Sequence, residues 1–398
     1  MRHHMLRLLN LQGFWVDGYT ITENQLVVAI RSPRRSAVCP RCQHVSRRIH
    51  QIHQRYLKHT RWGPRQVMLK LIRRRFWCRW CGRAFGELLS GIGRRRSTPA
   101  YREGLVEELR RQSFRYVMKK TGASSNLLYD ALHGATRRPI DWTAQGTAIT
   151  IGVDEHSYRG RHLVTTVTNI TTPRLLGVGR SDSQGELRRL LVDIPAKTVA
   201  EVCMDMRAGY RPVIQECLPQ ARIVIDKFHV IAAANRVVDQ IRSVIVTDHR
   251  HVKRLLLTGQ ERLHSRQTEK LQQLFRDYAM FPTLKQSYLV KEKVRAMYES
   301  TDRATAARCL DHIIMLCETG DTQYLQVFGR TLNSWREEIL NHFIRHSTNA
   351  VTEGINTKIK MIKRVSFGFR NIDHYIAKVM LAFTPLTIAI ATLNHHTI

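Results

Sequence analysis

Residues 147–155, TAITIGVDE, form the first of several apolar strand patterns that decide the fold. Helical patterns at 183–194 and 209–218 interrupt the later strands. The other strand patterns are HLVTTVTNIT (162–171), RLLGVGRS (174–181), TVAEVCMDM (198–206) and ARIVIDKFHV (221–230). Short apolar runs that alternate with helices are typical of an α/β domain.

The order of these elements is more specific than their composition. Three strands follow one another as a meander, and helices and strands then alternate. This is the order of the ribonuclease H-like fold, which we therefore predict as the catalytic domain. Residues 230–346 then have almost entirely helical spacing, so we expect a large helical insertion before the pattern 347–364.

Three acidic residues are candidates for a metal site. Asp154 and Asp205 each end an apolar strand, and Glu353 lies on the predicted helix 347–364. Phosphodiester chemistry with two Mg²⁺ (or Mn²⁺) ions needs carboxylates that converge on one point. Each residue alone could equally be a turn, cap or surface residue. Glu155 competes with Asp154, and the periodicity of the strand does not choose between them.

The helix that carries Glu353 offers further polar groups. Glu353, Asn356 and Lys360 are spaced to share one face, which would present a metal ligand, an amide and a cation toward a phosphate. A solvated amphipathic helix would have the same spacing.

The charge of the chain points to a polyanionic partner. The 398 residues include 64 Lys+Arg and 32 Asp+Glu, giving a net charge of +32. Residues 1–98 alone contain 21 basic and 3 acidic residues. Nucleic acid is the commonest such partner, although a merely cationic surface is the alternative. No apolar run reaches the ~20 residues of a membrane span, and no convincing signal peptide begins the chain, so we expect a cytoplasmic, nucleoid-associated protein without a membrane partner.

Two CxxC pairs predict one structural Zn²⁺. Cys39 and Cys42 form the first pair, and Cys78 and Cys81 the second. A predicted strand, 66–76, lies between them and could close a hairpin that joins both pairs. Redox or unliganded thiols are the alternatives, and nearby histidines could replace a cysteine. Residues 20–31, before the first pair, alternate as one strand.

Residues 98–140 have the layout of a helix-turn-helix. A turn at Gly122 precedes a helix that Ser124 or Ser125 would cap. The residues that we expect to contact DNA are Arg115, Lys119, Lys120, Ser124, Ser125 and Asn126.

Three strings resemble a known family. IGVDEHSYRG (151–160), the segment 202–230 and the segment 347–371 are similar to bacterial insertion-sequence transposases of the ISL-three family. The resemblance extends over nearly the whole chain. It implies that Asp154, Asp205 and Glu353 are the catalytic triad, in preference to Glu155. It also implies that Asp226 and His229 support the site without ligating metal.

The resulting hypothesis is a DNA transposase that acts on the terminal inverted repeats of its element and on target DNA as a homodimer. A DNA-binding regulator with a vestigial nuclease fold and a repair-type nuclease are the alternatives. The expected domains are a zinc-binding basic module (1–97), a helix-turn-helix (98–140), the first part of the catalytic domain (146–229), the helical insertion (230–346) and the final catalytic helices (347–398).

Overall fold

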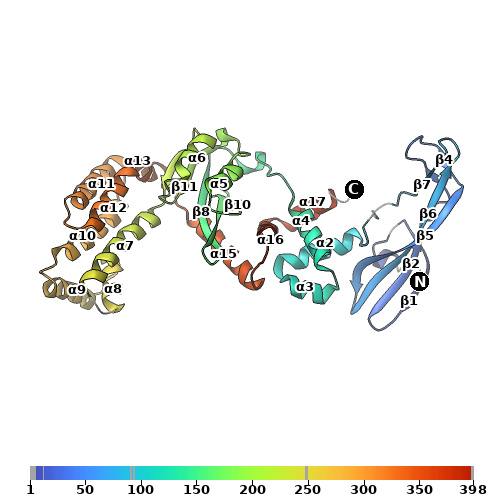
Figure 1. Cartoon of the computed structure of the whole chain (residues 1–398), viewed down its shortest axis with the longest axis horizontal. Helices are drawn as coiled ribbons and strands as arrows, with labels where there is room; N and C mark the ends of the chain where they lie inside the picture. Colours follow the sequence, from blue (N-terminus) through green and yellow to red (C-terminus); the bar gives the residue numbers. More distant parts are fainter. Residues whose placement is uncertain (1–5, 12, 90–91, 93–94, 247–249, 396–398) are drawn as a thin grey trace. The chain divides into compact units, whose positions relative to one another are not determined.

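The computed structural model describes residues 6–11, 13–89, 92, 95–246 and 250–395 (Figure 1). The chain divides into two compact units. The first consists of Met1–Pro139 together with Lys360–Ile398, and the second of Ile140–Ile359. The first unit is therefore built from both ends of the chain, and the mixed α/β character predicted from the sequence is confirmed.

A sheet and a small ribbon form the N-terminal part of the first unit. The sheet order is β1-β2-β6-β5, with β7 paired to β6, and β3 and β4 form the ribbon. The strands are β1 (Trp15–Ile21), β2 (Gln25–Arg31), β3 (Ala37–Val38), β4 (Val45–Ser46), β5 (Ile49–Trp62), β6 (Arg65–Cys78) and β7 (Arg83–Gly86). The predicted strand 66–76 is confirmed as part of β6. The antiparallel β5–β6 hairpin carries Cys78 back toward the first cysteine pair.

The prediction of one strand over residues 20–31 is wrong. The chain turns between β1 and β2, which pair with each other in antiparallel register. The amide of Thr22 donates to the carbonyl of Gln25 at 2.8 Å, and the amide of Gln25 donates to the Thr22 hydroxyl at 3.1 Å. The polar residues Glu23 and Asn24 occupy this tight turn, which alternation alone does not reveal.

Helices from both chain ends share one core in the first unit. They are α2 (Pro99–Arg111), α3 (Phe114–Thr121), α4 (Ser125–Thr136), α16 (Ile372–Phe383) and α17 (Leu386–His395). The Ser124 hydroxyl accepts from the amide of Leu127 and caps α4, and Gly122 has the left-handed φ of 67° that ends α3. Leu381 and Leu393 are buried in the same apolar cluster as Leu105 and Leu128.

The second unit contains a mixed five-stranded sheet of order β10-β9-β8-β11-β12. The strands are β8 (Ile149–Arg159), β9 (His162–Asn169), β10 (Arg174–Val178), β11 (Val199–Met204) and β12 (Arg222–Ile225), with α5 (Gln184–Leu191) and α6 (Tyr210–Cys217) between the later ones. β8, β9 and β10 pair antiparallel, whereas β8, β11 and β12 are parallel. The predicted meander followed by alternating helices and strands is therefore present.

β8 does not end at Asp154 as predicted. It continues to Arg159, because its pairing with β9 extends well beyond the point where β11 stops. The last β8 residue paired with β11 is Gly152. Asp154 thus lies past the carboxyl end of the neighbouring strand, which leaves its side chain near the residue that follows β11.

The stretch after β12 is helical, as predicted. The helices are α7 (Lys227–Ile245), α8 (Arg250–Leu257), α9 (Ser265–Asp277), α10 (Pro282–Met297), α11 (Arg303–Glu318), α12 (Gln323–Ser334), α13 (Arg336–Leu340) and α14 (His342–Arg345). Their buried apolar side chains join those of the sheet in one cluster. No helix in the described part of the chain combines the length and apolar character needed to cross a membrane.

Helix α15 (Ala350–Val365) carries Glu353, as predicted, and belongs to both compact units. Its residues up to Ile359 are in the second unit, and those from Lys360 onward are in the first. The segment predicted as the final catalytic helices therefore divides between the units, because α16 and α17 pack on α4. The five domain boundaries themselves stay a prediction.

Candidate active site and metal centres

Asp154 is half-buried on β8, and both of its carboxylate oxygens accept hydrogen bonds. Oδ1 accepts from the backbone amide of Glu155 at 2.7 Å, and Oδ2 accepts from Nδ2 of Asn356 at 2.7 Å. Because both contacts orient the carboxylate, its direction is fixed by the strand below it and by α15 beside it.

A buried chain of hydrogen bonds orients the Asn356 amide. The Thr166 hydroxyl on β9 donates to Oδ1 of Asn356 at 3.0 Å, and Nδ1 of His156 lies 2.9 Å from the same hydroxyl. A hydroxyl has one proton to donate, so His156 must donate to Thr166 through Nδ1. Asn356 is only 3% exposed and directs its amide at Asp154.

Gly152 allows α15 to approach β8 closely. A Cβ atom at this position would lie 2.1 Å from the Thr352 hydroxyl and 2.5 Å from Oδ1 of Asn349. The same two side chains bond to the sheet: the Thr352 hydroxyl contacts the Thr168 hydroxyl at 2.7 Å, and Nδ2 of Asn349 donates to the carbonyl of Val153 at 3.2 Å. A glycine on β8 therefore sets the distance between the strand of Asp154 and the helix of Glu353.

Asp205 directly follows β11 and lies against His229 in the first turn of α7. Nε2 of His229 is 2.7 Å from Oδ1 of Asp205. Ligand atoms of Asp154, Asp205 and His229 all lie within 4.8 Å of one another. A second group, formed by Asp226, His229 and Glu353, meets the same limit. The structure thus places the three predicted carboxylates around one histidine, with Glu353 grouped with Asp226.

The electrostatics of this site favour a bound cation. Burial raises the pKa of Asp154, and repulsion from Asp205 raises it further. Burial likewise raises the pKa of Asp226 and of Glu353, and these two carboxylates also repel each other. Burial opposes protonation of His229, but Asp205 outweighs it and raises the histidine pKa.

The donor set suits a hard divalent ion. Four carboxylates supply the oxygen ligands that Mg²⁺ and Mn²⁺ prefer, and a cation would relieve their mutual repulsion. Oδ1 of Asp205 and Nε2 of His229 have no hydrogen-bond partner of good geometry among the described residues, despite their close contact. The residues present therefore fit the implied metal.

Sequence reasoning missed an ion-pair network beside the site. Arg207 donates to Oε1 of Glu155 at 2.7 Å and to both the carbonyl and Oδ2 of Asp182 at 2.8 Å. The guanidinium lies 4.6 Å from the centre of the Tyr210 ring. Glu155, the rival of Asp154, is therefore engaged by an arginine. Arg207 stands two residues after Asp205, but nothing in that spacing predicts its partners.

Lys360 is exposed and belongs to the first compact unit, whereas Glu353 and Asn356 belong to the second. Its predicted role beside a phosphate stays a prediction.

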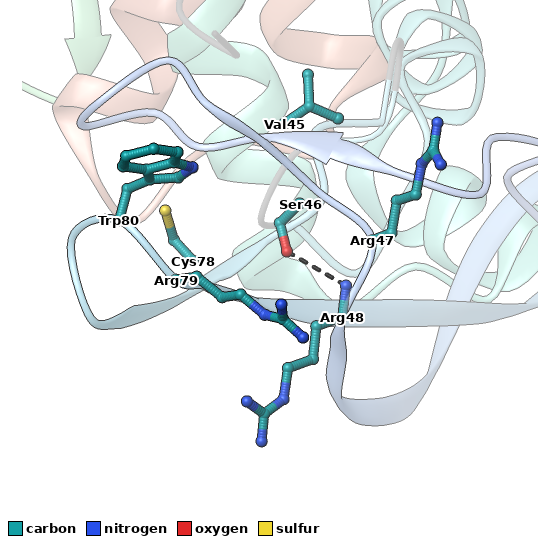
Figure 2. Close-up of a pocket in the computed structure, with 7 residues that line it drawn as sticks. All are labelled: Val45, Ser46, Arg47, Arg48, Cys78, Arg79 and Trp80. Carbon is teal, nitrogen blue, oxygen red and sulfur yellow. Dashed lines mark hydrogen bonds between the residues drawn. The ribbon is translucent and has the colours of Figure 1, made fainter.

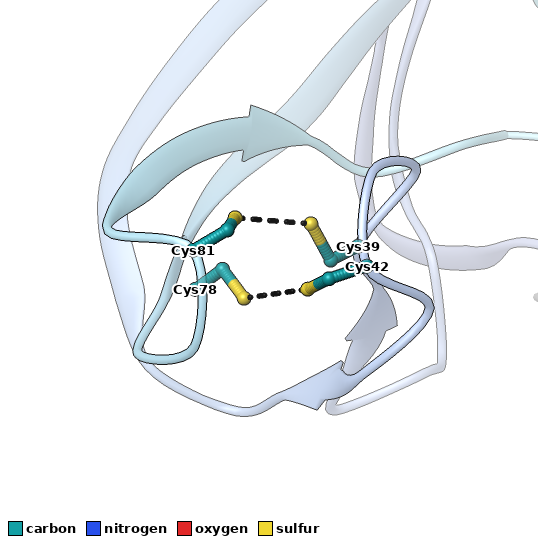
Figure 3. A group of neighbouring side chains, drawn as sticks. All are labelled: Cys39, Cys42, Cys78 and Cys81. Atoms are coloured by element: carbon teal, nitrogen blue, oxygen red, sulfur yellow. Dashed lines mark hydrogen bonds between the residues drawn. The ribbon is translucent and has the colours of Figure 1, made fainter.

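The four predicted cysteines lie together (Figure 3). Sγ of Cys39 is 3.7 Å from Sγ of Cys81, and Sγ of Cys42 is 3.4 Å from Sγ of Cys78. Four thiolates at Zn–S distances of about 2.3 Å in a tetrahedron would be about 3.8 Å apart. The thiol spacing therefore fits one zinc ion, and this group contains no histidine among the described residues.

The two CxxC turns share one backbone geometry. The amide of Cys42 makes the largest of several contacts that together lower the pKa of the Cys39 thiol to about 6, and the amide of Cys81 likewise lowers the pKa of Cys78. Burial and the neighbouring thiols raise the pKa of Cys81 instead. The residue after each pair is left-handed: Gln43 has a φ of 59° and Gly82 a φ of 66°. Amides aimed at sulfur stabilise thiolates, which are the form that binds metal.

The predicted DNA contacts on the helix-turn-helix are mostly at the surface. Arg115, Lys119, Lys120, Ser124 and Asn126 are exposed, and Ser125 is half-buried. Lys120 forms an ion pair with Glu108 at 2.5 Å, which raises the lysine pKa. The rest of α4 packs against α2, α16 and α17. The predicted contacts at the start of α4 therefore lie at the surface, and their role toward DNA stays a prediction.

More than half of this chain matches a known protein family. The family of ISL3-type DDE transposases, described as "Transposase", matches residues 151–379, which is more than half of the chain. The chain belongs to this transposase family. The matched span contains Asp154, Asp205 and Glu353, so the carboxylate site lies inside the region that defines the family.

One individual transposase extends the similarity over most of the chain. The chain is similar to the transposase for insertion sequence element IS1001 of Bordetella parapertussis, with 26% identity over an alignment that covers 94% of this chain and 96% of the relative. It is also similar to the transposase for insertion sequence element IS1557 of Mycobacterium tuberculosis (strain H37Rv), with 24% identity over an alignment that covers 58% of this chain and 59% of the relative. Family membership makes DNA the substrate class.

Proposed function

We propose that this member of the family binds the terminal inverted repeats of an insertion sequence and catalyses DNA cleavage and strand transfer with Asp154, Asp205 and Glu353. One observation carries the proposal. Carboxylates from β8, from the end of β11 and from α15 meet around His229, and Asp226 joins them. Nothing about sheet stability requires so many acids in one half-buried place, and their repulsion is costly without a cation.

We also propose a ribonuclease H-like fold for the catalytic part. The order β10-β9-β8-β11-β12, with three antiparallel strands and two parallel ones, supports it. In this arrangement Asp154 and Asp205 come from adjacent strands, and the helices α7 to α14 separate them in sequence from Glu353.

Two bound Mg²⁺ or Mn²⁺ ions would activate the attacking oxygen and stabilise the leaving oxygen of the phosphodiester. The chain's own residues prepare the ligands for that role. Asn356 and the amide of Glu155 fix the direction of Asp154, and His229 lies against Asp205. Close packing of α15 over Gly152 keeps Glu353 within reach of Asp226.

The first unit would supply recognition of DNA. One structural Zn²⁺ on Cys39, Cys42, Cys78 and Cys81 would hold the basic sheet module together. The start of α4 would read base edges at the element ends, while Arg115 and Lys119 contact phosphates. Two ends must be brought together for transposition, so we propose that the active form is a homodimer.

Purified full-length protein incubated with Mg²⁺ and a plasmid that carries the element ends tests the proposal. Asp154→Asn, Asp205→Asn and Glu353→Gln should each abolish cleavage and strand transfer, because each removes one charge from the ligand set. Binding to the element ends should persist, because it resides in the first unit. Wild-type protein that binds the ends without cutting them would instead indicate a regulator, and near wild-type cleavage by any of the three variants would refute the triad.

A further inference from the structure

A cleft of about 440 Å³ lies beside the cysteine cluster (Figure 2). Residues 45–48 form one wall and residues 78–80 the other. The volume lies in the range of roughly 300–1,000 Å³ that small-ligand pockets occupy. Cys78 contributes both to this cleft and to the cysteine cluster, so the proposed zinc site would support one wall.

Hydrogen bonds hold the two walls together. The Ser46 hydroxyl donates to the carbonyl of Trp77 at 2.7 Å, and the amide of Trp77 donates to the carbonyl of Arg48 at 2.8 Å. The amide of Cys39 donates to the carbonyl of His44 at 2.9 Å. The cleft is therefore part of a cross-linked turn structure and needs little rearrangement to receive a ligand.

The cleft is strongly cationic. Figure 2 shows Arg79 extending from one wall toward Arg48 on the other. Among the residues that the structure describes, none of the ion pairs involves Arg47, Arg48 or Arg79. Two of the three acids in residues 1–98 are already paired with other arginines, Asp17 with Arg31 and Glu87 with Arg74. These guanidinium groups therefore remain available for an external anion.

Trp80 adds a large exposed aromatic surface to this cationic cleft. Its side chain is 74% exposed, and its ring stacks on His44 with centroids 4.4 Å apart. Nδ1 of His44 lies 2.9 Å from the carbonyl of Cys42, which fixes the imidazole beneath the indole. A supported indole beside arginines is the combination that proteins use to bind single strands, in which bases stack on aromatic rings and phosphates meet cations.

We infer that this cleft binds a nucleotide of an unpaired DNA strand, with its base stacked on Trp80 and its phosphate on Arg48 and Arg79. In a duplex the faces of the bases are covered by their neighbours, so a protein ring can stack only where a strand is unpaired. Arginines alone would suffice for a duplex backbone. The inference rests on the proposed function, since cutting at an element end is what would supply an unpaired strand.

Binding of zinc-loaded full-length protein to a fluorescein-labelled oligothymidine strand, and to a duplex of equal length, tests the assignment. Loss of one stacked base weakens binding by about 1–3 kcal/mol, so Trp80→Ala should weaken single-strand binding by about 5- to 150-fold. Trp80→Phe should retain most of the affinity, and duplex binding should change little. Arg48→Ala and Arg79→Ala should each make the plot of log affinity against log salt concentration less steep for the single strand, by about the amount that one phosphate contact contributes.

Trp15→Ala is the matched control. Trp15 is also exposed and carries Arg31 over its ring, but it lies outside the cleft, so its loss should leave single-strand binding unchanged. Zinc content of every variant shows whether the fold persists. Equal weakening of duplex and single-strand binding by Trp80→Ala, or no weakening at all, would overturn the inference. Cleavage of element ends by wild-type protein, measured in parallel, separates failure of the cleft from failure of the proposed function.

Discussion

Nη1 of Arg207 lies 2.7 Å from Oε1 of Glu155, the carboxylate next in sequence to the proposed metal ligand Asp154. Successive residues on a strand point to opposite faces, so Asp154 and Glu155 cannot both face α15. Asp154 meets Asn356 on that helix, whereas Glu155 meets Arg207, which also holds Asp182. The two neighbouring acids thus have different environments, one with space for a cation and one already paired with a guanidinium.

Glu155→Gln should therefore be milder than Asp154→Asn in the cleavage assay. Arg207→Ala should impair cleavage more than Glu155→Gln, because it leaves a partly buried carboxylate without its partner. The double variant should recover part of the loss, since it removes the unpaired charge as well. Arg188→Ala, which breaks an exposed pair with Glu216, is the control and should have little effect. Equal inactivity of Glu155→Gln and Asp154→Asn would contradict this assignment.

Gly152→Ala should separate α15 from the sheet. The added methyl would collide with the Thr352 hydroxyl and with Asn349, so we expect a loss of about 1–3 kcal/mol in the free energy of unfolding and a steep fall in cleavage. Gly354→Ala, on the solvent side of α15 with open space around its Cβ position, should instead stabilise the protein by about 0.5–1 kcal/mol. Thermal unfolding and cleavage rates compare the two, and equal behaviour would show that close approach at Gly152 is unimportant.

Metal analysis should find about one zinc ion per chain, and Cys78→Ser should lose it. Loss of zinc should loosen the turns at 39–42 and 78–81 and weaken DNA binding, because a structural zinc site contributes directly to folding free energy. Cys309→Ser, at a half-buried thiol outside the cysteine cluster, should retain the metal. Protein purified without chelator and found free of zinc would refute the site.

Lys378 should make stability depend on pH. Its side chain is 2% exposed, its Nζ donates to the carbonyl of Gln112 at 2.9 Å, and burial lowers its pKa from 10.5 to about 8. Between pH 8 and 10.5 the unfolded chain binds more protons than the folded one, so this residue's contribution to the free energy of unfolding rises with pH. Below pH 8 the buried amine is protonated, and it lowers the free energy of unfolding by its full amount.

Lys378→Met should accordingly stabilise the protein at pH 7, on the order of 2 kcal/mol once the lost hydrogen bond is subtracted, and should flatten the rise above pH 8. Chemical unfolding at several pH values measures both effects. Lys119→Met, at an exposed position, should leave the pH profile unchanged. A Lys378→Met profile identical to that of the wild type would show that the buried amine does not titrate in this range.

Local patterns were enough to predict much of this fold. The apolar runs at β8 and β11, a cap at Ser124 or Ser125 and the helix of Glu353 all follow from spacing and residue type, and the structure has each of them, with Ser124 as the cap. The turn between β1 and β2 was missed because the prediction treats residues 20–31 as one strand, although the polar run Thr22 to Gln25 interrupts the alternation between Ile21 and Leu26. The full length of β8 was missed because its second half pairs only with β9. The pairing of β8 with β11 stops at Gly152, whereas its pairing with β9 continues to Arg159.

The long-range contacts of the site residues could not be predicted from the sequence. The Asp154–Asn356 contact joins residues 202 positions apart, and the Thr166–Asn356 contact joins residues 190 apart. Spacing placed Glu353, Asn356 and Lys360 on one helical face, yet only tertiary packing decides that Asn356 meets a carboxylate. Likewise Arg207 is one of many arginines in a basic chain, and its partners Glu155 and Asp182 come from separate segments.

The apolar core that α2–α4 share with α16 and α17 can be completed only when synthesis of the chain is nearly finished. Leu128 and Leu132 on α4 emerge from the ribosome long before Leu381 and Leu393, against which they are packed in the finished protein. A nascent chain therefore carries these helices with part of their apolar surface uncovered until the last residues are made. A product that stops after Glu353 would possess every proposed catalytic carboxylate and still lack the helices that complete its DNA-binding core.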